Sequence, residues 1–248
     1  MSSVVYIVAI FAERGGLENA ITSTKASCSL HIERLRSCSD PRITKVLFVV
    51  NSDAPERVDG QLAGFGLELS ALIGCPVEIC VRPNTGYSYG AWEYGVQRAL
   101  AGPEEYAFLI EDDYVPAVPN FLDPFLAESS ARVGFVAQQL EALPGHIAPV
   151  HAAVSNGLLA LGCARVTLDM FGRIFAIYPF AMRGGDHILG TENQVTFLAL
   201  AEAAGFCISD VADSCSIPYH DTPTNGIRER GQASKPAPLV PVSTLVGG

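Results

Sequence analysis

At residues 106–113 the chain reads Tyr-Ala-Phe-Leu-Ile-Glu-Asp-Asp, an apolar run that stops abruptly at three consecutive carboxylates. The run predicts a strand over Tyr106–Ile110, and three earlier runs predict strands over Val4–Phe11, Ile43–Val50 and Val77–Val81. These runs are continuously apolar and rich in β-branched residues, a pattern typical of strands that are buried on both faces of a sheet.

Segments with helical spacing of apolar residues separate these four strands. The spacing predicts helices over Glu18–Leu35, Leu62–Ile73 and Tyr89–Leu100. The order over about the first 115 residues is therefore β-α-β-α-β-α-β. Such an order predicts an α/β fold, in which a Rossmann-like, mostly parallel central sheet is flanked by helices.

The second half of the chain has a mixed pattern. Its apolar runs predict strands over Val133–Gln138, Ser155–Cys163 and Phe206–Asp210, and helices over Val166–Gly172 and Thr191–Ala204. After His220 the composition turns to Pro, Gly, Thr and Ser. We therefore expect a single domain over residues 1–230, with halves at 1–115 and 116–230, and a flexible or extended tail over residues 231–248.

The composition excludes several classes of protein. Of the 248 residues, 49% are hydrophobic, which argues against a disordered chain. Lys and Arg number 16 against 26 Asp and Glu, a net charge of −10 that disfavours non-specific binding to nucleic acid or to an anionic membrane.

The cysteines and the N-terminal sequence bear on the cellular compartment of the protein. The seven cysteines form no C-x-x-C pair, so a zinc ribbon or a thioredoxin-type motif has no support. The N-terminus lacks a basic signal-peptide region, and no apolar run approaches the ~20 residues of a membrane span. We expect a cytoplasmic protein without a transmembrane segment, free or docked at a membrane surface. Its oligomeric state is left open.

The acidic end of the fourth strand is a candidate ligand site. In open α/β sheets, ligands bind beyond the carboxyl ends of the strands. Three adjacent carboxylates at Glu111–Asp113 repel one another, and a hard cation such as Mg²⁺ or Mn²⁺ relieves this repulsion because it prefers oxygen ligands. The alternative interpretation is a solvated acidic turn.

A glycine-rich segment, Arg82–Gly95, leads from the third strand into a helix. Gly86 and Gly90 would let backbone approach a ligand closely, and a helix N-terminus favours phosphate. The alternative is a tight turn followed by an aromatic-rich packing helix.

Together these segments resemble the nucleotide-sugar-binding half of GT-A glycosyltransferases, above all glycosyltransferase family 2. The N-x-G-x-x-x-G-A-W-x-x-G pattern of Asn84–Gly95 resembles enzymes of the rhamnan and capsule type. The resemblance covers about residues 4–220 and implies a GT-A-like sheet with an acceptor-side half. It also implies that Glu111-x-Asp113 matches the D-x-D motif, which holds a divalent metal against the donor pyrophosphate.

The resemblance implies a role for further residues on the nucleotide side. Asp113 is the principal metal ligand, with Glu111 or Asp112 in support. Asn51 and Asp53 fall where the family places an acidic residue against the nucleobase, and Arg82 replaces a family arginine that is absent here. The full set of predicted nucleotide contacts is Ala9, Phe11, Asn51, Asp53, Arg82, Asn84, Gly86, Tyr89, Gly90 and Asp112.

The acceptor half carries the predicted base. Thr191–Gln194 opens a helix as a capping box, which is a structural interpretation in itself. The segment also resembles the family's E-D motif, whose Asp is the general base. That position is Asn193 here, so the predicted base is Glu192 or Asp186. His220 is either a third metal ligand or an ordinary surface or core histidine.

The resulting expectation is a metal-dependent, inverting glycosyltransferase. It would use Mn²⁺ or Mg²⁺ and move a sugar from a UDP-, dTDP- or GDP-sugar to a hydroxyl of a glycan or another acceptor. A sugar nucleotidyltransferase is one alternative, because Phe11–Gly16 partly matches the G-x-G-x-R-like loop of such enzymes. A non-catalytic nucleotide- or sugar-binding module is another, because of Asn193 and the altered D-x-D motif.

Overall fold

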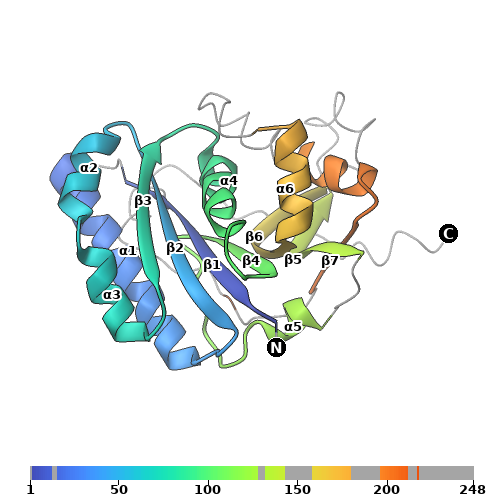
Figure 1. Ribbon diagram of the computed structural model, residues 1–248, viewed down its shortest axis with the longest axis horizontal. Helices are drawn as coiled ribbons and strands as arrows, with labels where there is room; N and C mark the ends of the chain where they lie inside the picture. Colours follow the sequence, from blue (N-terminus) through green and yellow to red (C-terminus); the bar gives the residue numbers. More distant parts are fainter. Residues whose placement is uncertain are drawn as a thin grey trace.

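A computed structural model of the chain describes residues 2–12, 16–127, 132–142, 158–179, 196–211 and 217. These residues form a seven-stranded sheet in the order β3-β2-β1-β4-β6-β5-β7 (Figure 1). The strands are β1 Val4–Phe11, β2 Ile43–Ser52, β3 Val77–Pro83, β4 Tyr106–Glu111, β5 Val133–Ala142, β6 Leu158–Thr167 and β7 Cys207–Asp210.

The sheet has a parallel half and a mixed half. Strands β3, β2, β1 and β4 pair in parallel, so their carboxyl ends share one edge. Strand β6 runs antiparallel to both β4 and β5, and β7 pairs in parallel with β5. The predicted α/β fold with a mostly parallel first half and a mixed second half is confirmed.

Helices cover both faces of the sheet. The helices are α1 Leu17–Cys38, α2 Pro55–Leu62, α3 Phe65–Ile73, α4 Tyr87–Ala99, α5 Asp123–Leu126 and α6 Leu168–Ile177, and residues 196–203 are also helical. Helices α1 to α3 pack on one face, and α4, α6 and the helix over 196–203 pack on the other (Figure 1).

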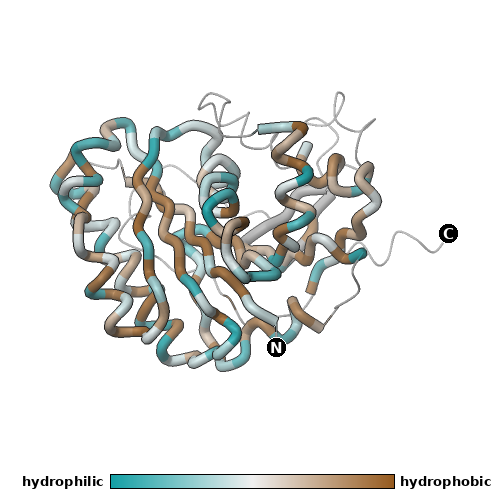
Figure 2. Tube along the Cα trace, in the orientation of Figure 1, coloured by the Kyte–Doolittle hydropathy of each residue, from teal (hydrophilic) through white to brown (hydrophobic). Residues whose placement is uncertain are grey.

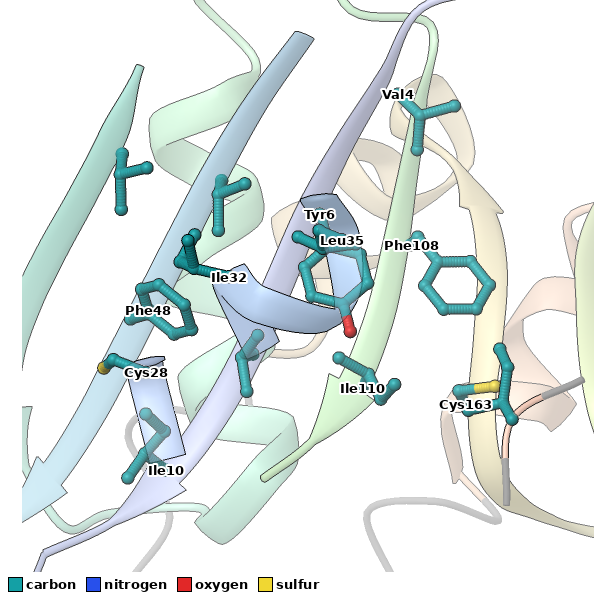
Figure 3. Close-up of a cluster of buried hydrophobic side chains, with 14 of the residues drawn as sticks. Val4, Tyr6, Ile10, Cys28, Ile32, Leu35, Phe48, Phe108, Ile110 and Cys163 are labelled. Atoms are coloured by element: carbon teal, nitrogen blue, oxygen red, sulfur yellow. The ribbon is translucent and has the colours of Figure 1, made fainter. Parts of the chain in front are cut away.

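Each face has its own hydrophobic core. Along β1, Tyr6 and Ile10 face α1, whereas Ile7 and Ala9 face α4, as the alternation of side chains along a strand requires. Figure 3 shows the core on the α1 side. Apolar residues run continuously along the central strands (Figure 2), because these strands are covered on both faces.

Several element boundaries differ from those that the sequence predicts, and two of the differences have a clear physical reason. The helix expected over Leu62–Ile73 begins only at Phe65, because Gly64 adopts a left-handed conformation (φ 83°). Leu62 is instead the last residue of α2, a helix that the sequence did not predict. The short helix expected from Val166 begins at Leu168 instead. Val166 and Thr167 belong to β6, where Val166 pairs with both Ala107 and Phe135.

The predicted 231–248 tail lies outside the described residues. Among the described helices, none is long and apolar enough to cross a membrane.

Candidate functional site

The candidate site lies where the four parallel strands end. Strands β1 and β4 are neighbours, yet the chain leaves β1 toward β2 and β3 and returns to β4 on the other side. This reversal of strand order is a topological switch point, the place where open α/β sheets bind ligands. Ala9 of β1 lies beside Glu111 of β4 in the parallel register, so both belong to this edge.

The turn before α4 is held to the sheet in an uncommon conformation. Gly86 and Tyr87 both have positive φ angles, of 71° and 49°. A positive φ is uncommon for a residue other than glycine, and it persists where the surroundings fix it. Asn51, at the end of β2, donates a hydrogen bond from Nδ2 to the Tyr87 carbonyl (3.2 Å). The Tyr87 ring also stacks on Phe11 at the end of β1, with 5.7 Å between ring centroids.

A buried arginine holds the same turn from β3. Arg82 is only 5% exposed, and its Nη1 donates to Asn51 Oδ1 at 2.5 Å. Its Nη2 donates to the carbonyl oxygen of Thr85 (2.9 Å) and to the Thr85 hydroxyl (2.7 Å). Burial lowers the pKa of the Arg82 guanidinium, although Glu93 and Tyr94 act in the opposite direction.

The acidic residues at the end of β4 are half-buried at Glu111 and buried at Asp112 and Asp113. The Glu111 carboxylate accepts a hydrogen bond from the Ser88 hydroxyl in the first turn of α4 (2.5 Å). Burial, and then the charge of Asp112, raise the pKa of Cys28 on α1. Asp112 and Asp113 are 8% and 2% exposed, so both are largely removed from water.

Most of the predicted nucleotide contacts gather at this edge. Asn51 is fully buried, and its two amide ends contact Arg82 and Tyr87, so its predicted contact with a nucleobase stays a prediction. Asp53 follows β2 and is exposed. The other predicted nucleotide contacts that lie at the edge are Ala9, Phe11, Arg82, Asn84, Gly86, Gly90 and Asp112. The predicted metal ligands Glu111 and Asp113 lie there as well.

One predicted residue lies in the core instead. Tyr89 is 4% exposed, and its ring packs against Trp92 and Phe197, with centroid separations of 5.0 and 5.8 Å. Burial raises the pKa of its hydroxyl. Tyr87, two residues earlier, is half-buried at the edge, as is Phe11.

Sequence reasoning missed Thr85 and Ser88. Both are hydroxyl residues inside the glycine-rich segment, and this position could have identified them as candidate site residues. Asp186, Glu192 and His220 lie outside the described residues.

No group of three or more His, Cys, Asp or Glu side chains is arranged to hold a metal ion within the described part of the chain. Mg²⁺ and Mn²⁺ commonly take only one or two protein carboxylates and complete their shell with phosphate oxygens and water. Asp112 and Asp113, two buried carboxylates that follow one another in the sequence, are donors of the right chemistry for such an arrangement.

No family model matches the chain, and no curated protein matches it. Solved structures do match over most of its length. A CMP:2-keto-3-deoxy-manno-octonic acid synthetase complexed with CTP has a TM-score of 0.50 and 11% identity, covering 92% of this chain and 97% of that one. A putative glucose-1-phosphate thymidylyltransferase from Bacillus anthracis, in complex with sucrose, has a TM-score of 0.51 and 16% identity, covering 92% and 93%.

A third match is residues 1–349 of TarS from S. aureus, with a TM-score of 0.51 and 8% identity, covering 89% of this chain and 60% of that one. At these identities the similarity establishes the fold alone. It confirms the predicted fold class, and membership of glycosyltransferase family 2 stays a prediction.

Proposed function

We propose that the protein is a sugar nucleotidyltransferase, which joins a nucleotide to a sugar at the shared edge of β1, β2, β3 and β4. The observation that carries this proposal is the buried Asp112–Asp113 pair at the switch point between β1 and β4. Two solved structures matched over 93% or more of their own length bear the names of such enzymes, which supports nucleotidyl transfer ahead of the glycosyl transfer expected from the sequence.

The reaction needs the nucleotide to be positioned and its charge to be neutralised. An oxygen of the sugar or of its phosphate attacks the α-phosphorus of a nucleoside triphosphate, the bond to the β-phosphate breaks, and pyrophosphate leaves. Such transfers depend mainly on alignment and electrostatic stabilisation. The N-terminus of α4, which begins at Tyr87 beside this edge, favours a negatively charged group.

The carboxylates at the edge would repel a triphosphate on their own. A bound Mg²⁺ or Mn²⁺ would neutralise phosphate charge and polarise the reacting phosphoryl group. Asp112 and Asp113 would hold the ion. Glu111 and His220 are predicted supporting ligands, and Glu111 is already hydrogen-bonded to Ser88.

A second candidate is inverting glycosyl transfer. The observation in its favour is that the Asn84–Gly95 segment, which carries the family resemblance, lies against the end of β4 through the Ser88–Glu111 hydrogen bond. In this reaction an acceptor hydroxyl attacks the anomeric carbon of a UDP-, dTDP- or GDP-sugar, and the nucleoside diphosphate leaves. Glu192 or Asp186 would accept the proton.

Product analysis separates the two reactions. The full chain is incubated with CTP, UTP, dTTP, GTP or ATP and a set of sugars and sugar 1-phosphates, and separately with nucleotide sugars and glycan acceptors, in Mn²⁺, Mg²⁺ or EDTA. Release of pyrophosphate supports nucleotidyl transfer, whereas release of nucleoside diphosphate supports glycosyl transfer. Binding without either product supports a non-catalytic module.

The variant Asp113→Asn tests the site itself. It removes a carboxylate charge with little change of shape, and we expect turnover to fall by on the order of 100-fold or more. Asp169→Asn is the matched control, because Asp169 is an exposed residue paired with Arg173 on α6. Normal turnover in Asp113→Asn would contradict the assignment.

A further inference from the structure

The guanidinium of Arg82 connects three segments at the edge of the sheet. It belongs to β3, and it donates to Asn51 at the end of β2 and to Thr85 in the turn before α4. Asn51 in turn donates to the Tyr87 carbonyl. We define these four residues, Asn51, Arg82, Thr85 and Tyr87, as the turn latch.

We infer that Arg82 is a positioning residue, which holds the turn before α4 in the shape that faces the nucleotide, and that it does not itself bind phosphate. Both terminal nitrogens of its guanidinium already donate to Asn51 and Thr85, and the residue is almost completely buried. The buried carboxylate of Glu93 provides the nearby opposite charge. The part of this inference that concerns nucleotide rests on the proposed function.

The turn needs such support because of its backbone. Tyr87 has a left-handed φ of 49°, which costs free energy for any residue with a side chain. An amide side chain has one acceptor end and one donor end. Because Arg82 engages Oδ1 of Asn51, the Nδ2 group points to the Tyr87 carbonyl and stabilises the turn.

The packing of α4 is matched to the latch. A Cβ atom at Gly90 would collide with the carbonyl oxygen of Thr85 and lie 3.2 Å from Nη1 of Arg82. The glycine therefore lets the first turn of α4 lie directly against the latch. Both glycines of the N-x-G-x-x-x-G-A-W pattern thus have a role in this turn. Gly86 adopts its left-handed backbone conformation, and Gly90 leaves room for the Thr85 carbonyl.

Hydrogen exchange of the nucleotide-free protein tests the latch directly. In Arg82→Gln we expect the amides of residues 86–91 to exchange about tenfold faster, because the charged hydrogen bonds to Asn51 and Thr85 are lost. Arg82→Lys should give an intermediate effect, because lysine keeps the charge but lacks the planar fork.

The amides of β1 report whether the sheet stays intact in these variants. Arg98→Gln is the matched control, since Arg98 is an arginine of α4 that contacts Glu78 on β3 at a distance from the turn. Unchanged exchange over residues 86–91 in both Arg82 variants would overturn the inference.

Nucleotide affinity distinguishes positioning from direct phosphate binding. The mono-, di- and triphosphates of the base that binds best among CTP, UTP, dTTP, GTP and ATP are titrated with Mn²⁺. A positioning role predicts that Arg82→Gln weakens all three by the same factor, about tenfold. A direct phosphate contact predicts a loss that grows with each added phosphate, which would overturn the inference.

If the wild-type protein binds none of these nucleotides, the proposed function fails. The hydrogen-exchange result then decides the role of Arg82 by itself.

Discussion

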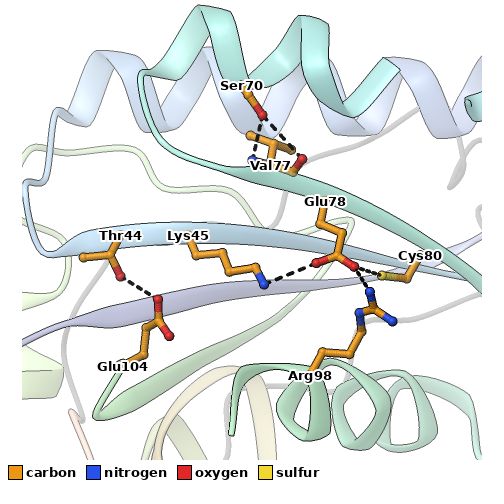
Figure 4. A network of polar contacts seen from close by, with 8 residues as sticks. All are labelled: Thr44, Lys45, Ser70, Val77, Glu78, Cys80, Arg98 and Glu104. Atoms are coloured by element: carbon orange, nitrogen blue, oxygen red, sulfur yellow. Dashed lines mark hydrogen bonds and ion pairs between the residues drawn. The ribbon is translucent and has the colours of Figure 1, made fainter. Parts of the chain in front are cut away.

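Two polar networks connect β2, β3 and α4, and they are built in opposite ways. The turn latch places a buried arginine, 5% exposed, against neutral acceptors on Asn51 and Thr85. The second network, near the amino ends of β2 and β3, joins the Glu78 carboxylate to Lys45 and Arg98 (Figure 4). The side chain of Arg98 is 45% exposed.

The difference indicates that the charged residue with the larger effect on stability is Arg82, which forms no ion pair in the described hydrogen-bond network. In the second network, water screens the attraction between the charges, and it can solvate the charge that remains when one partner is removed. Each ion pair therefore contributes little to the free energy of unfolding. In the latch, removal of the guanidinium takes the donor from the fully buried Asn51 and the half-buried Thr85, and a buried acceptor is costly to leave unpaired. The network with fewer opposite charges should therefore be the more sensitive one.

The largest expected effect is the loss of stability in Arg82→Met. We expect the free energy of unfolding to fall by about 2–4 kcal/mol, because Asn51 and Thr85 lose a charged donor inside the protein. Arg98→Met, measured beside it by urea denaturation, should lose less than about 1 kcal/mol. If both variants lost the same free energy of unfolding, the latch would be no more sensitive than the Glu78 network, contrary to this prediction.

A smaller loss is expected in Gly90→Ala. The added methyl group meets the Thr85 backbone, which has little room to move, so we expect a loss of about 1–3 kcal/mol in the free energy of unfolding. Gly60→Ala on α2 is the matched control, because a Cβ at Gly60 meets no atom within 4 Å. This control should gain up to about 1 kcal/mol from better helix propensity, and a loss as large as that of Gly90→Ala would contradict the packing argument.

The parallel half of the sheet could be predicted from the sequence because its signal is local. Val4–Phe11 is apolar at every position, and the strand in the structure has the same bounds. The acidic end of β4 was also visible, since a run of carboxylates after an apolar strand stands out in any reading.

Other features depend on contacts between distant residues and left no local signal. The latch joins Asn51 to Arg82 across 31 positions, so no pattern in either segment predicts it. The inward position of Tyr89 and the outward position of Tyr87 depend on where α4 begins, which the left-handed Gly86 sets. The start of α3 at Phe65 was missed for a similar reason, because Gly64 fits either a continuous helix or a turn.

The smallest expected effect is the pH dependence of the Glu78 network. Burial alone would raise the pKa of Glu78, but contacts with Lys45, Cys80 and Arg98 outweigh it and lower the pKa below its usual value. A lowered pKa in the folded state means that the carboxylate stabilises the protein above the unfolded value of about 4.3, and that this contribution is lost as the pH falls further.

Glu78→Gln should therefore cost about 0.5–1 kcal/mol at pH 7, and the difference from wild type should shrink as the pH falls through about 4 or as NaCl rises to about 1 M. Urea denaturation at several values of pH and salt measures this. The loss in Arg82→Met should change less over the same salt range, because Arg82, Asn51 and Glu93 are buried and salt screens buried charges weakly. A latch that weakens with salt as much as the Glu78 network would have to be accessible to water, contrary to its burial.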